Sequence, residues 1–201
     1  MECKSLRVTE LKVGRDCAKK LYFSKQSPWE KNSHMYIGNC LHTAYEQYFR
    51  KKGRTGLCLS LREMEAIVIG EFNKNKHTVK KWCDTEENVL RDGKACLKQY
   101  YDKRLAVLFP LNEKNTDLIE YPVYMDLNKN GKRLRITGTV DLVTKSRIVC
   151  DHKKSGKGWR EGAELKEPQA YLYPYLLMVL GFNILGFEFN VSPPTDVQGL
   201  P

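Results

Sequence analysis

The chain has 201 residues and a mass of 23.3 kDa; 41% of its residues are hydrophobic and 29% are charged, as in a globular domain with a full core. The longest apolar stretch is interrupted by Pro174 and is too short to cross a bilayer, so we expect no membrane partner. The formal net charge of +10 favours a polyanionic partner, because each phosphate that a lysine or arginine neutralises releases counterions.

The cysteines and the first residues indicate an intracellular protein. Seven cysteines are scattered along the chain without a Cys-x-x-Cys pair, which argues against a disulfide framework and a zinc ribbon. The first residues lack the apolar segment of a signal peptide, so we expect a cytoplasmic or other intracellular location. The length suits one domain, with a mainly helical part over 1–110, a sheet core over 111–192 and an irregular tail over 193–201.

The first predicted segment, over residues 5–25, places lysines beside aromatic residues. Lys19 and Lys20 precede Tyr22 and Phe23, a combination that suits gripping a nucleic-acid backbone and stacking on bases. The same aromatic residues would equally serve as part of the core, and the sequence leaves both interpretations open.

A helix is predicted from about Met35 to Lys51, with Gly53 ending it. His42 and Glu46 are four residues apart and therefore share one stripe of this helix. A lone histidine on a helix is commonly structural or solvated, so His42 indicates a functional site only if other functional groups face it.

Two scaffold helices are predicted next, over residues 60–80 and 84–108. Each begins with a capping-box pattern, Ser60-x-x-Glu63 in the first and Asp84-x-x-Glu87 in the second.

Strand periodicity follows. Residues 118–127 and 133–144 flank the sequence Asn128-Lys-Asn-Gly131, and Asn-Gly tolerates the positive φ that a tight hairpin turn needs. Residues 147–153 and 183–191 supply two more strands, separated by a helix that begins near Pro168. This order predicts a mixed sheet with helices on its faces, an α/β (α+β) fold.

The second hairpin can bring two carboxylates and an ammonium together. With a three-residue loop over 145–147, counting back along both strands sets Asp141 opposite Asp151, and Lys153 shares the face of Asp151. Facing carboxylates repel each other unless a cation bridges them, so this pairing indicates a metal site. The alternative is a polar strand face with incidental charges.

The last helix carries an amide and a phenol one turn apart, Gln169 and Tyr173, and both groups are able to donate to a phosphate. They would equally be ordinary helix residues. A basic run over 153–160, which includes Lys154, adds positive charge near the predicted carboxylates.

Four motifs therefore occur in order: Gly38-x-x-x-His42-x-x-x-Glu46, Gly138-x-x-Asp141, Asp151-x-Lys153 and Gln169-x-x-x-Tyr173. On these predicted elements they resemble the RecB-like branch of the PD-(D/E)XK nucleases, which includes viral and phage exonucleases and the nuclease of CRISPR adaptation. Residues 17–23, Cys-Ala-Lys-Lys-Leu-Tyr-Phe, are similar to a Cys-Pro-x-Lys-Phe-Tyr segment of the family. The resemblance covers roughly residues 5–190 and implies a restriction-endonuclease-like sheet core with a helical N-terminal elaboration.

The resemblance implies a DNA nuclease that uses Mg²⁺ or Mn²⁺, an exonuclease in recombination, repair, viral genome processing or defence. Lys153 would orient or deprotonate the attacking water, or stabilise charge in the transition state, and both roles stay open. Glu46 would assist the ligands or a second cation. The implied metal ligands are His42, Asp141, Asp151 and the backbone carbonyl of His152. The residues expected to hold DNA are Gln169, Tyr173, Lys19, Lys20 and Lys154.

One departure concerns the iron–sulfur cluster of some family members, which needs three cysteines after the last helix. Cys17 matches the first ligand position, but no cysteine follows Cys150, so we expect no cluster. Two alternatives remain open at this point: a nucleic-acid-binding module with a degenerate nuclease fold, and an endonuclease of the same superfamily.

Overall fold

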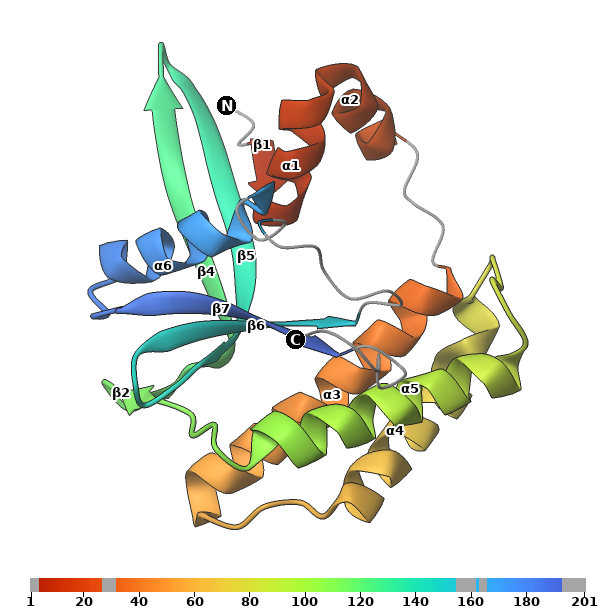
Figure 1. Ribbon diagram of the computed structural model, residues 1–201. Coiled ribbons are helices and arrows are strands. Elements are labelled where there is room, and N and C mark those ends of the chain that lie inside the picture. Colours follow the sequence, from red (N-terminus) through yellow and green to blue (C-terminus); the bar gives the residue numbers. More distant parts are fainter. Residues whose placement is uncertain (1–3, 27–31, 155–161, 163–165, 193–201) are drawn as a thin grey trace.

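The computed structural model describes residues 4–26, 32–154, 162 and 166–192. The predicted tail over 193–201 and most of the basic run over 153–160 lie outside these residues. The fold is mixed α/β, with a helical layer below a mixed sheet in the view of Figure 1. The predicted fold class is confirmed. None of the helices in the described ranges combines the length and apolar character that crossing a bilayer requires.

The helices follow the predicted order, with two short helices near the start of the chain. They are α1 (Val8–Asp16), α2 (Ala18–Gln26), α3 (Ser33–Thr55), α4 (Leu61–Asn75), α5 (Glu86–Tyr100) and α6 (Gln169–Val179). A 3-10 turn (Lys76–Thr78) follows α4, and a π-helical turn (Tyr101–Leu105) follows α5.

Several predicted helix ends are wrong, and two of them have a local reason. Helix α5 ends at Tyr100, before the predicted position 108, and continues as the π-helical turn. Helix α3 continues through Gly53 and ends at Gly56, whose φ of 71° is the left-handed conformation that a C-cap requires. Helix α5 is capped by Thr85 rather than Asp84, because the Thr85 side chain accepts from the backbone N–H of Asn88. Helix α4 keeps the predicted Ser60 capping box but ends at Asn75, five residues before the expected position.

The sheet places β5 (Lys132–Val143) at its centre. Its antiparallel neighbour on one edge is β4 (Ile119–Lys129). On the other edge β5 pairs first with β1 (Lys4–Arg7), in parallel, and then with β6 (Ile148–Lys154), which in turn pairs with β7 (Gly186–Ser192). A separate short hairpin consists of β2 (Asn112–Glu113) and β3 (Thr116–Asp117).

Strand β1 was not expected, since residues 1–110 were predicted to be mainly helical. Its pairing covers positions 134–137 of β5, whereas β6 covers only 142 and 143. Among the described residues, the stretch of β5 between them has no strand partner on that edge, and this stretch ends at Asp141. The sheet is therefore open along this edge just before the predicted carboxylate.

The predicted Asn-Gly hairpin and the predicted register of the second hairpin are confirmed. Asn130 and Gly131 adopt φ values of 51° and 71°, as the Asn-Gly turn predicted. Leu142 pairs with Cys150, and the Thr144 N–H donates to the Ile148 carbonyl, as the three-residue loop predicted.

The apolar side chains of the β5–β6 hairpin are divided between two hydrophobic clusters. Val140 packs in the cluster beneath α6, while Leu142 and Cys150 pack in the cluster of α3, α4 and α5. The twist of the strands turns one predicted face towards two layers of helices.

Candidate metal and nuclease site

The site lies where α3 passes beneath the ends of β4, β5 and β6. Ser33–Thr55 forms a long helix because apolar residues recur at helical spacing, and the buried side of α3 includes Ile37, Leu41, Tyr45 and Phe49. His42 follows Leu41 and therefore lies at the border of this buried side. The helix carries His42 to residues more than 75 positions further along the chain.

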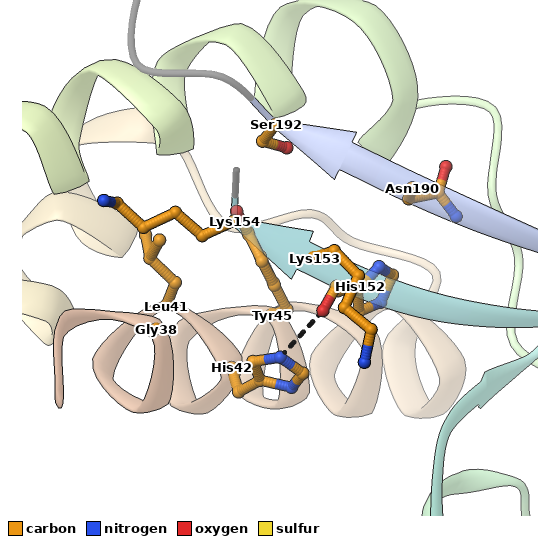
Figure 2. Close-up of a pocket in the computed structure, with 9 residues that line it drawn as sticks. All are labelled: Gly38, Leu41, His42, Tyr45, His152, Lys153, Lys154, Asn190 and Ser192. Carbon is orange, nitrogen blue, oxygen red and sulfur yellow. Dashed lines mark hydrogen bonds between the residues drawn. The ribbon is translucent and has the colours of Figure 1, made fainter. Parts of the chain in front are cut away.

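His42 contacts three groups from three strands. Its Nε2 donates to the carbonyl oxygen of His152 at 3.0 Å (Figure 2), and its Nδ1 lies 3.5 Å from Glu120 Oε1 and 3.6 Å from Asp141 Oδ2. One ligand atom from each of His42, Glu120 and Asp141 lies within 4.8 Å of the other two. An imidazole nitrogen and two carboxylate oxygens at this spacing are able to hold one divalent cation.

The surroundings of His42 already provide negative charge. Burial alone would lower the pKa of His42, but the hydrogen bond with Glu120 and the charges of Asp141, Glu120 and Asp151 raise the pKa to about 9. Burial raises the pKa of Asp141 to about 7, and the neighbouring Asp151 and Glu120 add to that shift. Without a metal, the imidazolium of His42 therefore supplies the positive charge between these carboxylates.

Asp151 lies beside this group and has partners of its own. Its Oδ2 is 2.7 Å from Lys153 Nζ, and its Oδ1 accepts from Gln169 Nε2 at 2.8 Å. Burial raises the pKa of Asp151, while the adjacent ammonium acts in the opposite direction. The predicted closeness of Asp151 and Lys153 is present, and the carboxylate is held from two sides.

His152 shows how strand alternation anchors the carbonyl that faces His42. The imidazole of His152 points to the opposite side of β6, where it stacks on Phe49 with an interplanar angle of 11° and hydrogen-bonds the Tyr100 hydroxyl at 3.0 Å. Burial lowers the pKa of His152 well below its usual value, so this ring is neutral. Its backbone is fixed further, because the N–H of His152 donates to Asp141 Oδ2 at 2.7 Å. The carbonyl faces Nε2 of His42, whereas Glu120 and Asp141 face Nδ1, so its predicted role as a metal ligand stays a prediction.

Glu120 was missed in the sequence, and Glu46 stands elsewhere. Glu46 accepts from Arg50 Nε at 2.8 Å within α3, while the carboxylate next to His42 is that of Glu120 on β4. Glu120 has a φ of 46°, between the paired residues Ile119 and Tyr121, so its backbone departs from the regular ladder. The Asn-Gly turn already contained the signal, because counting back from it sets Glu120 opposite Asp141.

Gln169 and Tyr173 are both buried and face the sheet from α6. The amide Nε2 of Gln169 lies 3.3 Å from the Tyr173 hydroxyl as well as near Asp151, so the pair connects the helix to the carboxylate. Tyr173 packs directly on Gly138, where an added Cβ would come 2.6 Å from the ring. The glycine of the second motif is therefore required by close packing, and the amide of the fourth positions Asp151.

Of the lysines predicted to hold DNA, Lys154 lies beside His42, whereas the other two lie on a separate helix. Lys154 is on β6 and lines a small cavity together with His42, Tyr45 and Lys153 (Figure 2). Lys19 and Lys20 lie on α2, beside Tyr22 and Phe23, whose side chains are 59% and 52% exposed. The interpretation of Tyr22 and Phe23 as core residues is wrong.

Comparisons with known proteins add little. No protein-family model and no curated protein matches the chain. The crystal structure of SSO0001 matches with 14% sequence identity, over 92% of this chain and 79% of that chain. Its TM-score of 0.27 is too low to carry any argument about fold or function.

Proposed function

We propose that the protein is a metal-dependent deoxyribonuclease that hydrolyses phosphodiester bonds. The observation that carries this proposal is the convergence of His42, Glu120, Asp141 and the His152 carbonyl, with the Lys153–Asp151 pair beside them. Charged groups in a packed interior are costly unless they are paired or bind a ligand, so such a cluster favours function over stability. The resemblance to the RecB-like nucleases supports the same conclusion.

The donor set fits a divalent cation. The two carboxylates suit Mg²⁺ or Mn²⁺, and the imidazole shifts preference towards Mn²⁺. Bound there, the cation would supply an electrophile for the phosphate oxygens and a water of lowered pKa. His42, Glu120 and Asp141 would hold it, and Asp151 would join them on their open side.

The protein's own groups have separate tasks. Gln169 keeps one oxygen of Asp151 in place, so that the other oxygen faces Lys153. The Lys153 ammonium lies at the edge of the carboxylate cluster, where it is able to offset the negative charge that develops on the phosphate. This electrostatic role fits the ion pair, and removal of a water proton by Lys153 would first require the ammonium to lose its own proton.

The test is a cleavage assay on linear and circular DNA, single- and double-stranded, with Mn²⁺, Mg²⁺ or EDTA. We expect Mn²⁺-dependent cleavage that Asp141→Ala and Lys153→Ala abolish, and resistance of circular DNA if the enzyme needs an end. Asp102→Asn is the matched control, because Asp102 is a carboxylate in a surface ion pair with Lys98. Unchanged cleavage in Asp141→Ala, or DNA binding without cleavage under any cation, would contradict the proposal and favour a degenerate binding module.

A further inference from the structure

One face of the β4–β5 hairpin forms an open groove above the metal-binding group. Cross-strand pairing sets Arg7 of β1, Thr137 of β5 and Tyr124 of β4 in one row. The next row contains Arg135 opposite Asp126. Arg7, Tyr124, Arg135 and Thr137 line a groove of about 590 Å³, together with Thr9, Thr139 and Tyr173 among others, and Asp126 holds Arg135 beside it.

Tyr173 of α6 borders one side of the groove beside Gly138, while Tyr124, Arg135 and Thr137 lie on the hairpin face away from α6. Ile136 points to the α6 face, where it is buried in the cluster beneath that helix. Tyr124 points away from that cluster, and its side chain is 52% exposed. Figure 1 shows β4 and β5 extending away from the helical layer formed by α3, α4 and α5. An exposed aromatic ring on an otherwise ordered strand is therefore free to meet a partner.

The groove leads to the candidate metal site. Alternate residues of β5, from Thr137 through Thr139 to Asp141, follow the same face. Four strand residues span about 13 Å, which corresponds to a few nucleotides of one strand. Tyr173 lines the groove, and Gln169 connects its hydroxyl to Asp151. A polymer that lies in the groove is therefore directed towards the carboxylates.

The chemistry of the groove suits bases and phosphates. The guanidinium carbon of Arg135 lies 4.9 Å from the centroid of the Tyr124 ring. Two hydrogen bonds to Asp126, at 2.8 and 2.9 Å, hold this guanidinium in place. Arg133 also pairs with Asp126, and Arg7 adds a further cation to the lining of the groove. An aromatic ring stacks on any base, and the arginines attract the backbone.

We propose that this groove binds an unpaired DNA strand, with Tyr124 stacking on a base and Arg7 contacting a phosphate. The inference deepens the nuclease proposal and rests on it for the direction in which the strand runs. In a duplex the base faces are already stacked on one another, whereas an unpaired strand offers them to the ring. The groove thereby selects single strands and frayed ends for the metal site.

Binding in EDTA tests the groove apart from cleavage. Anisotropy of a labelled single-stranded oligonucleotide should show roughly 10-fold or greater weakening in Tyr124→Ala, while Tyr124→Phe keeps the ring and stays within about 2-fold of the unchanged protein. Arg7→Gln should lower the slope of log K against log salt by about 0.7, the contribution of one phosphate contact to a single strand. Tyr175→Ala is the matched control, because Tyr175 is 48% exposed on α6, away from the groove.

The outcomes separate this inference from the proposed activity. Unchanged binding in Tyr124→Ala, or duplex bound more tightly than single strands, would overturn the groove whether or not the protein cleaves DNA. Tyr124-dependent binding without cleavage under any cation would support the groove and contradict the nuclease. Thermal unfolding of each variant shows that a loss of binding does not reflect a loss of fold.

Discussion

Asp126 and Asp141 lie on the same face of the β4–β5 hairpin, yet their charges are balanced in opposite ways. Asp126 is half-buried near the turn, where hydrogen bonds from Arg135 and Arg133 hold its pKa well below the usual value. Asp141 is buried at the other end, where burial raises its pKa to about 7 and its carboxylate neighbours add to the shift. Asp126 has two arginines as counter-ions. Asp141 instead belongs to a group with more negative charge than its neighbours neutralise.

This difference distinguishes a structural ion pair from the candidate metal site. Asp126 pairs with Arg135 across the two strands, whereas the carboxylate close to Asp141 is that of Glu120. Facing like charges destabilise a sheet unless a cation is present, so this end of the hairpin would gain stability from a bound metal.

Among the substitutions that test this comparison, Glu120→Gln should have the largest effect on cleavage. The amide keeps the shape but removes one anionic ligand, so we expect cleavage to fall by roughly 100-fold or more and Mn²⁺ binding to weaken. Glu46→Gln is the matched control, because Glu46 pairs with Arg50 and should affect cleavage far less. Steady-state cleavage rates and Mn²⁺ titrations of both variants provide the measurement. A greater loss of cleavage in Glu46→Gln than in Glu120→Gln would show that Glu46, and not Glu120, is the carboxylate that supports the reaction.

A smaller effect is expected for Gln169→Ala. Loss of the amide frees one oxygen of Asp151 without removing any predicted ligand, and such supporting contacts are typically worth about 10- to 100-fold in metal affinity or activity. Gln99→Ala, which removes a glutamine from α5, serves as the control in the same assay. A Gln169→Ala enzyme with full activity would mean that Lys153 alone positions Asp151.

Metal binding should change how stability depends on pH. The pKa of His42 is raised to about 9 in the folded protein, so its contribution is complete below about pH 6.5 and is lost as the pH rises through 9. The raised pKa of Asp141 acts in the same sense between its usual value and about 7. Without metal, the unfolding temperature should therefore fall as the pH rises from about 6.5 to 9.

Mn²⁺ should reverse this trend, because His42 and Asp141 must lose their protons to ligate. At about 100 times its dissociation constant, Mn²⁺ should add about 2.7 kcal/mol to the free energy of unfolding. Calorimetry in buffers of different ionisation enthalpy should detect proton release on binding at neutral pH. Binding that is independent of pH and releases no proton would contradict the assigned ligands.

The smallest effect is expected for Asp126→Asn. Its lowered pKa means that the stabilisation is present above the usual pKa of an aspartate and is lost as the pH falls through the folded value. Because both arginines that pair with Asp126 keep substantial exposure to solvent, the unfolding temperature should fall only slightly, and the difference should shrink at high salt. A large fall in the unfolding temperature that persists at high salt would show that Asp126 stabilises the fold by more than its ion pairs with the arginines.

Local chemistry made much of the fold predictable. The Asn130-Gly131 turn was enough to predict the first hairpin, and strand alternation was enough to predict the register of the second and the approach of Asp151 to Lys153. Helix ends were less predictable, because Gly53 is accepted within α3 while Gly56 alone takes the left-handed conformation. Propensity does not distinguish two glycines three residues apart.

The rest depends on contacts between distant segments. Four residues of β1 carry no strand pattern of their own, and they form a strand because β5 has an unpaired edge there. Lys52 is a second example: burial lowers its pKa, and its ammonium donates to the carbonyls of Leu105, Ala106 and Leu108. The sequence alone does not explain a buried lysine on the apolar side of α3, because the carbonyls that it binds lie at the end of the π-helical turn and just beyond it.

The pairing of β1 also bears on the order in which the molecule folds. Lys4 pairs with Leu134, so β1 must wait during synthesis for a partner 130 residues later in the chain. Helices α3, α4 and α5 make mostly local contacts and are able to form in the meantime, whereas pairings between distant segments form slowly. The groove beside Arg7 therefore forms late, and a newly made chain completes this face only after its helical layer.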